Sequence, residues 1–218
     1  MLDAVAAHPF GSRIYARLSP ERARAEAAAA SARAKAGLRR SPLDGVPISW
    51  KDLYDTAGVV TEAGSAMLEG RTPNIDATVV ARGRRAGAVS LGKTHMTELA
   101  FSGLGLTPVT QPPPNVNAPA LVPGGSSSGA GTAGAFGLAA AGSGSDTGGA
   151  VRIPAAWNNL VGLKTTHGLL PADGVVLLIE SFDTIGPLCR SSEAAALLPA
   201  MMAADRAPDL SGASVKGK

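Results

Sequence analysis

The pattern of apolar and polar residues along the chain, read together with capping residues, predicts helices in three segments. Residues 19–37 begin with Ser-Pro-Glu, continue through an alanine-rich stretch and end in glycine, which is typical of a capped helix. Asp76 precedes "ATVVARGRRAGA", whose apolar spacing predicts an amphipathic helix that Asp76 caps. A third helix is predicted in "SSEAAALLPAMMAA", with Ser191 or Ser192 as its cap.

Short apolar runs bounded by turn residues predict the strands. One is predicted in "LDGVPISW", where Pro47 confines it to a sheet edge or a bend because proline donates no ladder hydrogen bond. Three more are predicted in "AVSLGKT", "LVGLKTT" and "GVVLLIES". We expect a short helix or turn in "MTELAFSGLG", a closely packed helix in "TAGAFGLAAAG" and irregular chain at 107–123. Strands that alternate with helices predict an α/β fold with helices on both faces of a sheet.

Composition adds a packed core to this picture and excludes one class of partner. The chain has 218 residues, 45% of them apolar, and a mean hydropathy of +0.14, so one substantial domain is expected and disorder is not. The net charge is +3, from 20 basic and 17 acidic residues. Most of the basic excess lies within residues 1–40, where we expect the solvated face of a helix. No nucleic-acid partner is expected, because no aromatic residues interleave with a basic stripe.

Cysteine, histidine and the apolar runs bear on location and cofactors. The single cysteine, Cys189, allows no internal disulfide, which favours a reducing, cytoplasmic location. The three histidines and Cys189 lie far apart in the sequence and form no metal motif, so we expect no metal and no cofactor. The run of small apolar residues at 133–142 is too short to span a bilayer, so no membrane partner is expected.

A glycine-rich stretch raises the alternative of nucleotide binding. Residues 129–134, "GAGTAG", match G-x-G-x-x-G, but no strand leads directly into them and Asp146 lies too close to serve as the acidic residue of a dinucleotide site. A phosphate loop would need Gly-Lys-Ser/Thr at its end, which is missing. Nucleotide binding stays a separate hypothesis that a thermal-shift assay with nucleotides would test.

Two turns and one lysine are the candidates for chemistry. Residues 123–129, "PGGSSSG", form either a flexible loop or an ordered one whose enclosed hydroxyls need partners. The stretch "GSDTGGAVRIPA" carries a second pair of glycines, so that two backbones can converge on one site. Lys51 is either a surface lysine at a strand end or a buried one. Burial would lower its pKa and let the neutral amine act as a base toward a serine hydroxyl.

Four segments together resemble the amidase signature family, which hydrolyses the C–N bonds of amides. They are "LDGVPISWKDLYDTAG", "GKTHMTELAFSG", "PGGSSSGAGTAGAFGLAAAGSGSDTGGAVRIPAAWNNLVGLKTTHGLLPADGV" and "SFDTIGPLCRS", within residues 43–192. The resemblance implies a mixed sheet with helices on both faces, a Ser–cisSer–Lys triad and a small-molecule amide substrate. It divides the chain into an N-terminal helical segment at 1–40, a partial amidase core at 41–204 and a polar tail at 205–218.

The resemblance carries the family's catalytic residues onto three positions. Lys51 in "SWKD" matches the catalytic lysine, and Ser126, the first serine of "GGSSSG", matches the bridging serine that follows a cis peptide bond. The nucleophilic serine of the family stands directly after the two glycines of "SDTGGA", where this chain has Ala150. In the family's scheme the neutral lysine takes a proton from the bridging serine, which takes one from the nucleophile.

The resemblance also implies which residues surround the triad. Backbone N–H groups of the second turn are expected to form the oxyanion hole, namely those of Thr147, Gly148, Gly149 and Ala150. Three side chains are expected to support this turn: Ser127, Asp146 and Arg152. For the last two the alternative is a plain surface ion pair. The substrate is expected to lie against Gly125, Leu99, Ala100 and Phe101. His95 is a candidate for the same wall, or a purely structural residue.

This chain departs from the family in two respects. Ala150 has no side-chain oxygen, so no acyl-enzyme can form there and we expect almost no activity. An introduced inactivating substitution and a natural non-catalytic relative would both give this residue. Family members are longer, and their sheet continues past "DTIGPL". The sheet is therefore expected to be truncated, and the chain to self-associate or to need a complementary chain. A non-catalytic scaffold and an amidotransferase A-type subunit with a partner protein are the alternative functions.

Overall fold

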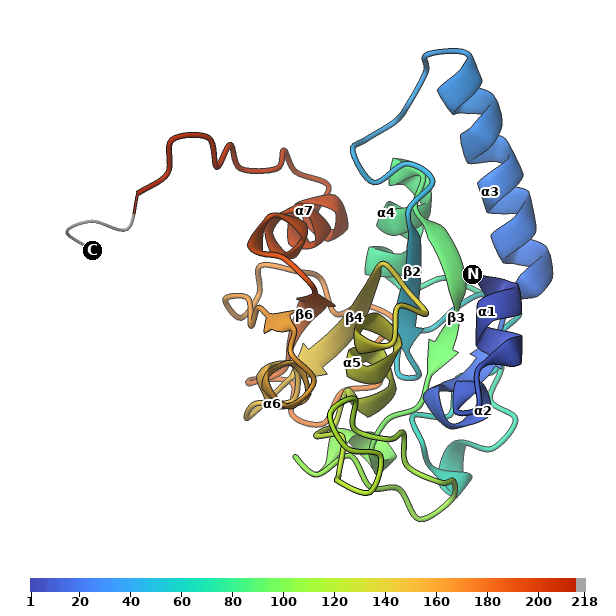
Figure 1. Cartoon of the computed structure of the whole chain (residues 1–218), viewed down its shortest axis with the longest axis vertical. Helices are drawn as coiled ribbons and strands as arrows, with labels where there is room; N and C mark the ends of the chain where they lie inside the picture. Colours follow the sequence, from blue (N-terminus) through green and yellow to red (C-terminus); the bar gives the residue numbers. More distant parts are fainter. Residues whose placement is uncertain (215–218) are drawn as a thin grey trace.

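A mixed six-stranded sheet forms the centre of the computed structural model, which describes residues 1–214 (Figure 1). Its strands are β1 (Tyr15–Leu18), β2 (Pro47–Lys51), β3 (Val89–Thr94), β4 (Ala141–Asp146), β5 (Val161–Gly162) and β6 (Thr184–Cys189). Their order across the sheet is β1-β3-β2-β4-β6-β5. β2 is parallel to β3 and to β4, whereas the β1, β6 and β5 pairs are antiparallel. The sheet is therefore mixed, as predicted.

Helices cover both faces of this sheet, as predicted. They are α1 (Leu2–Ala7), α2 (Gly11–Ile14), α3 (Pro20–Lys35), α4 (Thr78–Ala86), α5 (Ser128–Ala135), α6 (Arg152–Trp157) and α7 (Ser192–Ala203), with 3₁₀ turns η1 (Ala66–Leu68) and η2 (Glu98–Ala100). Successive residues of a strand face opposite sides. Gly142 of β4 lies against Ala130 of α5, and the next residue, Ser143, contacts Met202 of α7. α5 and α7 therefore pack on opposite faces.

The two faces are filled by side chains of very different size. Between the sheet and α4, Trp50 is 1% exposed and packs against Gly83, while Tyr54 meets its indole edge-on. On the other face, α5 consists of glycine, alanine, serine and threonine, and residues 128–134 of it are all buried. Because these side chains are small, α5 approaches the sheet closely. The "GAGTAG" run thus lies inside a buried helix and follows a loop.

The predicted helices formed, with one correction at a cap. α3 and α7 match the expected segments, and the Ser191 hydroxyl accepts a hydrogen bond from the N–H of Ala194, which settles the choice of cap for α7. Asp76 does not cap α4. The N-cap of α4 is Ala77, and the Asp76 carboxylate instead accepts hydrogen bonds from the Arg22 guanidinium of α3. The guanidinium binds both carboxylate oxygens, and such a bidentate pairing is stronger than a single hydrogen bond to a helix N-terminus.

The strand predictions were correct in part. β3 formed as expected. β2 lies between β3 and β4, so of the two alternatives for Pro47, a sheet edge or a bend, the edge was wrong. Pro47 is the first residue of β2, where a missing N–H is tolerated, and its carbonyl accepts from Ala140. The stretch expected as a strand at 174–181 forms a loop with one isolated bridge, between Tyr54 and Val175.

Other differences concern where elements begin and end. The helix expected over 132–142 starts earlier and ends at Ala135, and the last residues of that stretch open β4. β5 is two residues long, shorter than the strand expected there. β1, β4 and β6 were not predicted as strands. Residues 107–123 contain no helix or strand, as expected.

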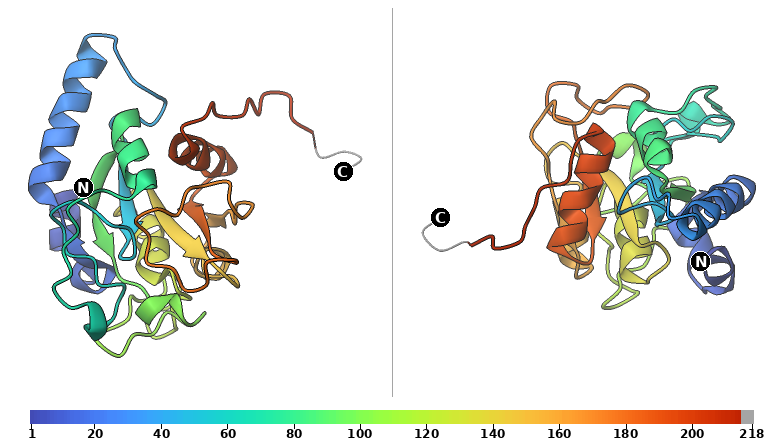
Figure 2. Two further views of the ribbon diagram at one scale, coloured as in Figure 1. Left: turned by 180° about the vertical axis from the view of Figure 1, so that it is seen from behind. Right: turned by 90° about the horizontal axis from the view of Figure 1, so that it is seen from above.

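The end of the chain lies apart from the sheet. Residues 205–214 of the predicted polar tail contain no helix or strand and run away from α7, as the views of Figure 2 show. Residues 215–218 of that tail lie outside the described part. No helix within residues 1–214 is long and apolar enough to cross a membrane.

Candidate active site

The site forms where the carboxyl ends of two neighbouring parallel strands meet. Lys51 is the last residue of β2, and Asp146 is the last residue of β4. Ligands of open α/β sheets bind at this edge because the loops that follow the strands converge there. The glycine-serine loop before α5 reaches the same edge and brings Ser126 and Ser127 to it.

Lys51 and Ser126 lie in direct contact. The Lys51 Nζ is 2.6 Å from the Ser126 Oγ and 2.8 Å from the Oγ of Ser145, a residue that sequence reasoning did not single out. Lys51 and Ser126 are both 0% exposed. Lys51 is therefore not a surface lysine.

The electrostatic surroundings of Lys51 favour the neutral amine near pH 7. Burial lowers its pKa from the usual value of 10.5 to about 7, although the carboxylates of Asp183 and Asp146 act in the opposite direction. At neutral pH a large fraction of the amine therefore carries a free lone pair. A lysine with a free lone pair can accept a proton from a hydroxyl.

The loop that carries Ser126 is held by backbone contacts on two sides. The Gly125–Ser126 peptide bond is cis. The Ser126 carbonyl accepts a hydrogen bond from the N–H of Thr97, and the N–H of Ser127 donates to the carbonyl of Ala150. A side-chain carbon at Gly125 would come within 2.6 Å of the backbone of Gly105, so this position requires glycine. The structure thus joins the two glycine turns that the sequence indicated.

The Asp146 side chain holds the turn of "SDTGGA" by hydrogen bonds to its backbone. Its carboxylate is fully buried and accepts from the N–H groups of Gly149, Val151 and Arg152 at 2.7–3.3 Å. The Arg152 guanidinium, which is half exposed, binds both of its oxygens. Burial opposes ionisation, but the hydrogen bonds from Arg152 and from the turn hold the pKa of Asp146 below its usual value. The pair is not a plain surface ion pair, because one partner is buried inside the turn.

This arrangement changes the set of free donors expected for an oxyanion hole. The N–H of Gly149 donates to Asp146 and is not available to a ligand. Within residues 1–214 no hydrogen bond is assigned to the N–H groups of Thr147, Gly148 and Ala150. The Thr147 hydroxyl donates to Asp183, another residue that sequence reasoning missed. Three of the four expected donors therefore remain.

A cavity of about 250 Å³ opens beside these donors. Ala150 lines it together with Gly125, Ala100 and Phe101, whereas the buried Ser126 does not. Leu99 does not line it either. Its backbone N–H donates to the carbonyl of Ala63 and its side chain packs against the hydrophobic core, so the expectation that Leu99 contacts a substrate stays a prediction without support from this cavity.

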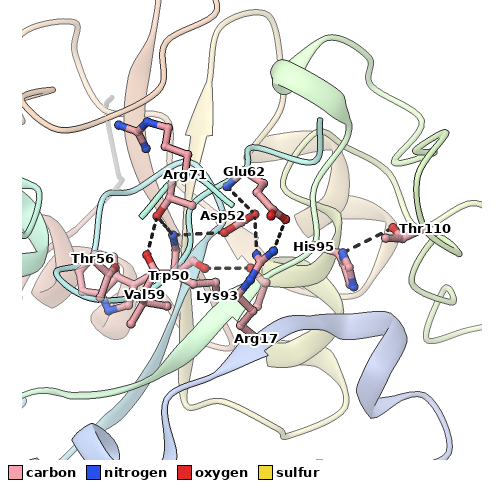
Figure 3. A network of polar contacts seen from close by, with 12 residues as sticks. Arg17, Trp50, Asp52, Thr56, Val59, Glu62, Arg71, Lys93, His95 and Thr110 are labelled. Carbon is pink, nitrogen blue, oxygen red and sulfur yellow. Dashed lines mark hydrogen bonds and ion pairs between the residues drawn. The ribbon is translucent and has the colours of Figure 1, made fainter. Parts of the chain in front are cut away.

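A second polar network surrounds Asp52 and Lys93 (Figure 3). Lys93, 1% exposed, hydrogen-bonds Thr61 and forms an ion pair with Asp52, which also pairs with Arg17. Burial lowers the pKa of Lys93 to about 8. His95 lines a separate cavity of about 410 Å³ beside this network and not the one beside Phe101, which favours the structural alternative for His95.

Sequence signals for the missed residues differ in strength. Lys93 ends an apolar strand in "LGKT" much as Lys51 does in "SWKD", and that parallel could have marked it as buried. Ser145 and Asp183 carry no such signal, because their contacts arise from strand pairing. Within the described residues no group of three histidine, cysteine or acidic side chains is arranged to hold a metal ion.

Comparison with known proteins gives matches over most of the chain. The family model described as Amidase matches residues 11–216. The A-type subunit of glutamyl-tRNA(Gln) amidotransferase from Anaeromyxobacter sp. (strain K) is 47% identical over 181 residues, which are 83% of this chain and 37% of that protein. The native peptide amidase from Stenotrophomonas maltophilia is similar in structure, with a TM-score of 0.86 and 37% identity over 95% of this chain and 43% of its own.

A solved structure is also available for a protein of the same kind as the first of these relatives. The solved structure of the A-type subunit of glutamyl-tRNA(Gln) amidotransferase from Thermotoga maritima has a TM-score of 0.71 and 38% identity, over 73% of this chain and 35% of its own. The chain thus spans less than half the length of each of these relatives.

Proposed function

The chain belongs to the amidase family, and on this premise we propose that its site is built to hydrolyse an amide C–N bond through a relay of position 150, Ser126 and Lys51. The observation that carries the proposal is the 2.6 Å contact between Lys51 Nζ and Ser126 Oγ, both fully buried, and Ser126 directly follows Gly125, which lines the same cavity as Ala150. A buried amine with a lowered pKa is partly neutral near pH 7 and can accept a proton, and the Ser126 hydroxyl in contact with it is the donor of this proposal.

The relay would work in two proton transfers. A serine oxygen at position 150 would attack the amide carbonyl carbon while its proton passes to Ser126 and the Ser126 proton passes to the neutral amine of Lys51. When the C–N bond breaks, the same path would return a proton to the leaving nitrogen. The free N–H groups of the second turn would stabilise the negative charge on the carbonyl oxygen by hydrogen bonds. Loss of one such donor typically slows a reaction by about 10²–10³.

Ala150 removes the attacking atom from this scheme. Without an oxygen at position 150 the acyl-enzyme cannot form, so the chain with Ala150 is proposed to be inactive or nearly so. Ser126 is a poor substitute because it is fully buried and does not line the cavity. The site retains the base, the bridging hydroxyl and the oxyanion donors.

The test restores the missing oxygen. Ala150→Ser is made in this chain and in a version completed with the additional length that its relatives have, and both are assayed against aryl and alkyl amides. We expect hydrolysis by the completed Ala150→Ser protein, with a rate that rises through about pH 7 as Lys51 loses its proton. Adding Lys51→Met should lower that rate by about 10²–10⁴. The absence of any gain in the completed protein would contradict the assignment of position 150.

An amidotransferase A-type role is the second candidate, and it rests on the identity of 47% to a protein of that kind. In this role the amide would be that of glutamine, and a partner protein would be required. Glutamine hydrolysis by the completed Ala150→Ser protein that appears only with such a partner would favour it. A non-catalytic scaffold, the third candidate, would bind a simple amide in calorimetry and gain no turnover from Ala150→Ser.

The partner proposal follows from the span of the chain. Because the chain covers less than half of its relatives, we propose that further chain, supplied by a second copy or a complementary protein, covers part of its surface.

A further inference from the structure

We propose that Ser145 is a positioning residue for the Lys51 amine: its hydroxyl oxygen accepts one N–H of the amine and so directs the lone pair at Ser126. This inference rests on the proposed function, in which Lys51 is the base. It adds a residue that the resemblance to the family did not bring forward.

The fold fixes Ser145 at this place. Ser145 belongs to β4, and its backbone pairs with Ile185 of β6 on the side away from β2. Its N–H donates to the Oγ of Ser127 at 3.3 Å, and its side chain is 4% exposed. The Ser145 Oγ is therefore held at 2.8 Å from Lys51 by the strand ladder and by the loop before α5.

The chemistry of a neutral amine makes this contact consequential. A neutral amine has two N–H donors and a single lone pair, and the lone pair alone can accept the proton of Ser126. Among the described residues, Nζ of Lys51 has hydrogen-bond contacts with Ser126 and Ser145. If Ser145 were absent, an N–H would turn toward the Ser126 oxygen, and the lone pair would then point away from the proton it must accept.

The charged groups near Lys51 do not set this orientation. Asp146, at the end of β4, and Asp183, which precedes β6, both favour the protonated amine by charge. Neither is assigned a hydrogen bond to Nζ, because Asp146 is engaged by its own turn and Asp183 by Thr147 and by Leu178. The Ser145 oxygen also favours the ammonium form, since a charged donor makes the stronger hydrogen bond. Its removal is therefore expected to lower the Lys51 pKa further.

The first test measures the titration of Lys51 without substrate. The chain has six lysines, so ¹³C labelling of lysine and NMR can follow each one, with Lys51→Met assigning the signal. We expect Ser145→Ala to lower the Lys51 midpoint by about one pH unit, as loss of a hydrogen bond to a charged group implies, and Ser145→Thr to leave it within a few tenths of a unit. Lys93, which contacts Thr61 and Asp52 instead, should titrate unchanged and reports that the fold is intact.

The second test measures orientation at a pH where protonation no longer matters. In the completed Ala150→Ser protein at pH 9, Ser145→Ala should slow the reaction of position 150 with an organofluorophosphonate by about tenfold, and Ser145→Thr should restore the rate. A Lys51 midpoint that does not move in Ser145→Ala while Lys93 titrates normally would overturn the positioning role. No reaction in the Ala150→Ser parent would instead overturn the proposed function, whatever the Lys51 midpoint does.

Discussion

At the scale of single residues, the site depends on a lysine that is buried without a carboxylate in contact. The Lys51 amine touches two hydroxyls, from Ser126 and Ser145, and no charged oxygen is hydrogen-bonded to it among the described residues. Burial therefore dominates and lowers the pKa of Lys51 to about 7. Lys93, one strand away, is also buried but forms an ion pair with Asp52, and its pKa falls less, to about 8. In both lysines burial is the main cause of the lowered pKa, and the nearby carboxylates act against it.

The buried amine of Lys51 should make stability depend on pH in a defined direction. Between pH 7 and about 10 the unfolded chain binds a proton at Lys51 that the folded chain does not, so the free energy of unfolding rises with pH. The free energy of unfolding of the chain with Lys51, measured relative to that of Lys51→Met, should rise by about 1.4 kcal/mol for each pH unit in this window. Urea unfolding at pH 7, 8 and 9 measures this difference. A difference that stays constant across the window would show that Lys51 is protonated in the folded chain.

Asp146 should contribute more to stability than its exposed partner. Asp146→Asn removes a buried carboxylate that three backbone N–H groups and Arg152 share, and should lower the free energy of unfolding by about 2–4 kcal/mol at pH 7. Arg152→Ala, the matched control, should cost less than Asp146→Asn, because the guanidinium is half exposed. Since the folded pKa of Asp146 is depressed, the cost of Asp146→Asn should shrink as the pH falls below about 4. Equal costs for the two variants at pH 7 would contradict this account.

At the scale of elements, the close approach of α5 to β4 places the serine loop at the strand ends. Both elements consist of small residues at their contact, and a side-chain carbon at Gly142 would come within 2.8 Å of the Ala130 carbonyl. The short distance between α5 and the sheet is therefore possible because Gly142 has no side chain. Any added carbon must move the helix, and with it the loop that carries Ser126.

This contact predicts a sharp difference between two glycines. Gly142→Ala should destabilise the fold by about 1–3 kcal/mol, because backbone atoms of α5 have to shift. Gly148→Ala is the matched control: it lies a few residues further along, has open space around it, and should change stability by less than about 0.5 kcal/mol. Thermal or urea unfolding of both variants provides the measurement, and equal effects would refute the close-packing argument.

The elements differ in how far the sequence predicted them. α3 begins with Ser-Pro-Glu and is rich in alanine, α7 has a serine N-cap, and β3 is a plain apolar run, so all three were predicted correctly. β4, "AGSGSD", has neither apolar pattern nor strand propensity, because Gly142 lies against α5 and Gly144 against Ser127, where no larger side chain fits. β6 contains Pro187 within the sheet, against the usual rule. Tertiary packing decides such strands, and local sequence does not record it.

The sequence predicted which motifs form the site, but it did not predict the individual hydrogen bonds between their residues. The two glycine turns and Lys51 were expected to converge, and the structure brings them together. The engagement of the Gly149 N–H by Asp146, and the contacts of Ser145 and Asp183, depend on which strand lies beside which. Such contacts cannot be derived from spacing along the chain.

At the scale of the whole molecule, the chain exposes several large apolar side chains on loops. Phe101 is 77% exposed, Phe182 is 62% exposed and Leu169 is 55% exposed. Phe101 lines the site cavity, and Phe182 precedes Asp183, which binds Thr147 of the second turn. Exposed apolar groups of this kind are typical of surfaces that another chain covers.

This surface predicts association. In size-exclusion chromatography with light scattering, the apparent mass of the chain should rise with concentration, and the double variant Leu169→Ser, Phe182→Ser should weaken that rise. Met67→Ser is the matched control, since Met67 is 83% exposed on η1, a different segment of the chain. A stable monomer at every concentration would contradict self-association and leave the complementary chain as the proposed partner.

The most direct test of the central claim is where a serine-directed reagent reacts. The completed Ala150→Ser protein is exposed to an organofluorophosphonate, and the adduct is located by peptide mass spectrometry, with Lys51→Met and the Ala150 parent as controls. The account predicts one adduct at position 150, formed faster as the pH rises through about 7, lost with Lys51→Met and absent from the parent. An adduct on Ser126, or none on the completed and folded protein, would contradict the proposal that position 150 is the nucleophile site of this fold.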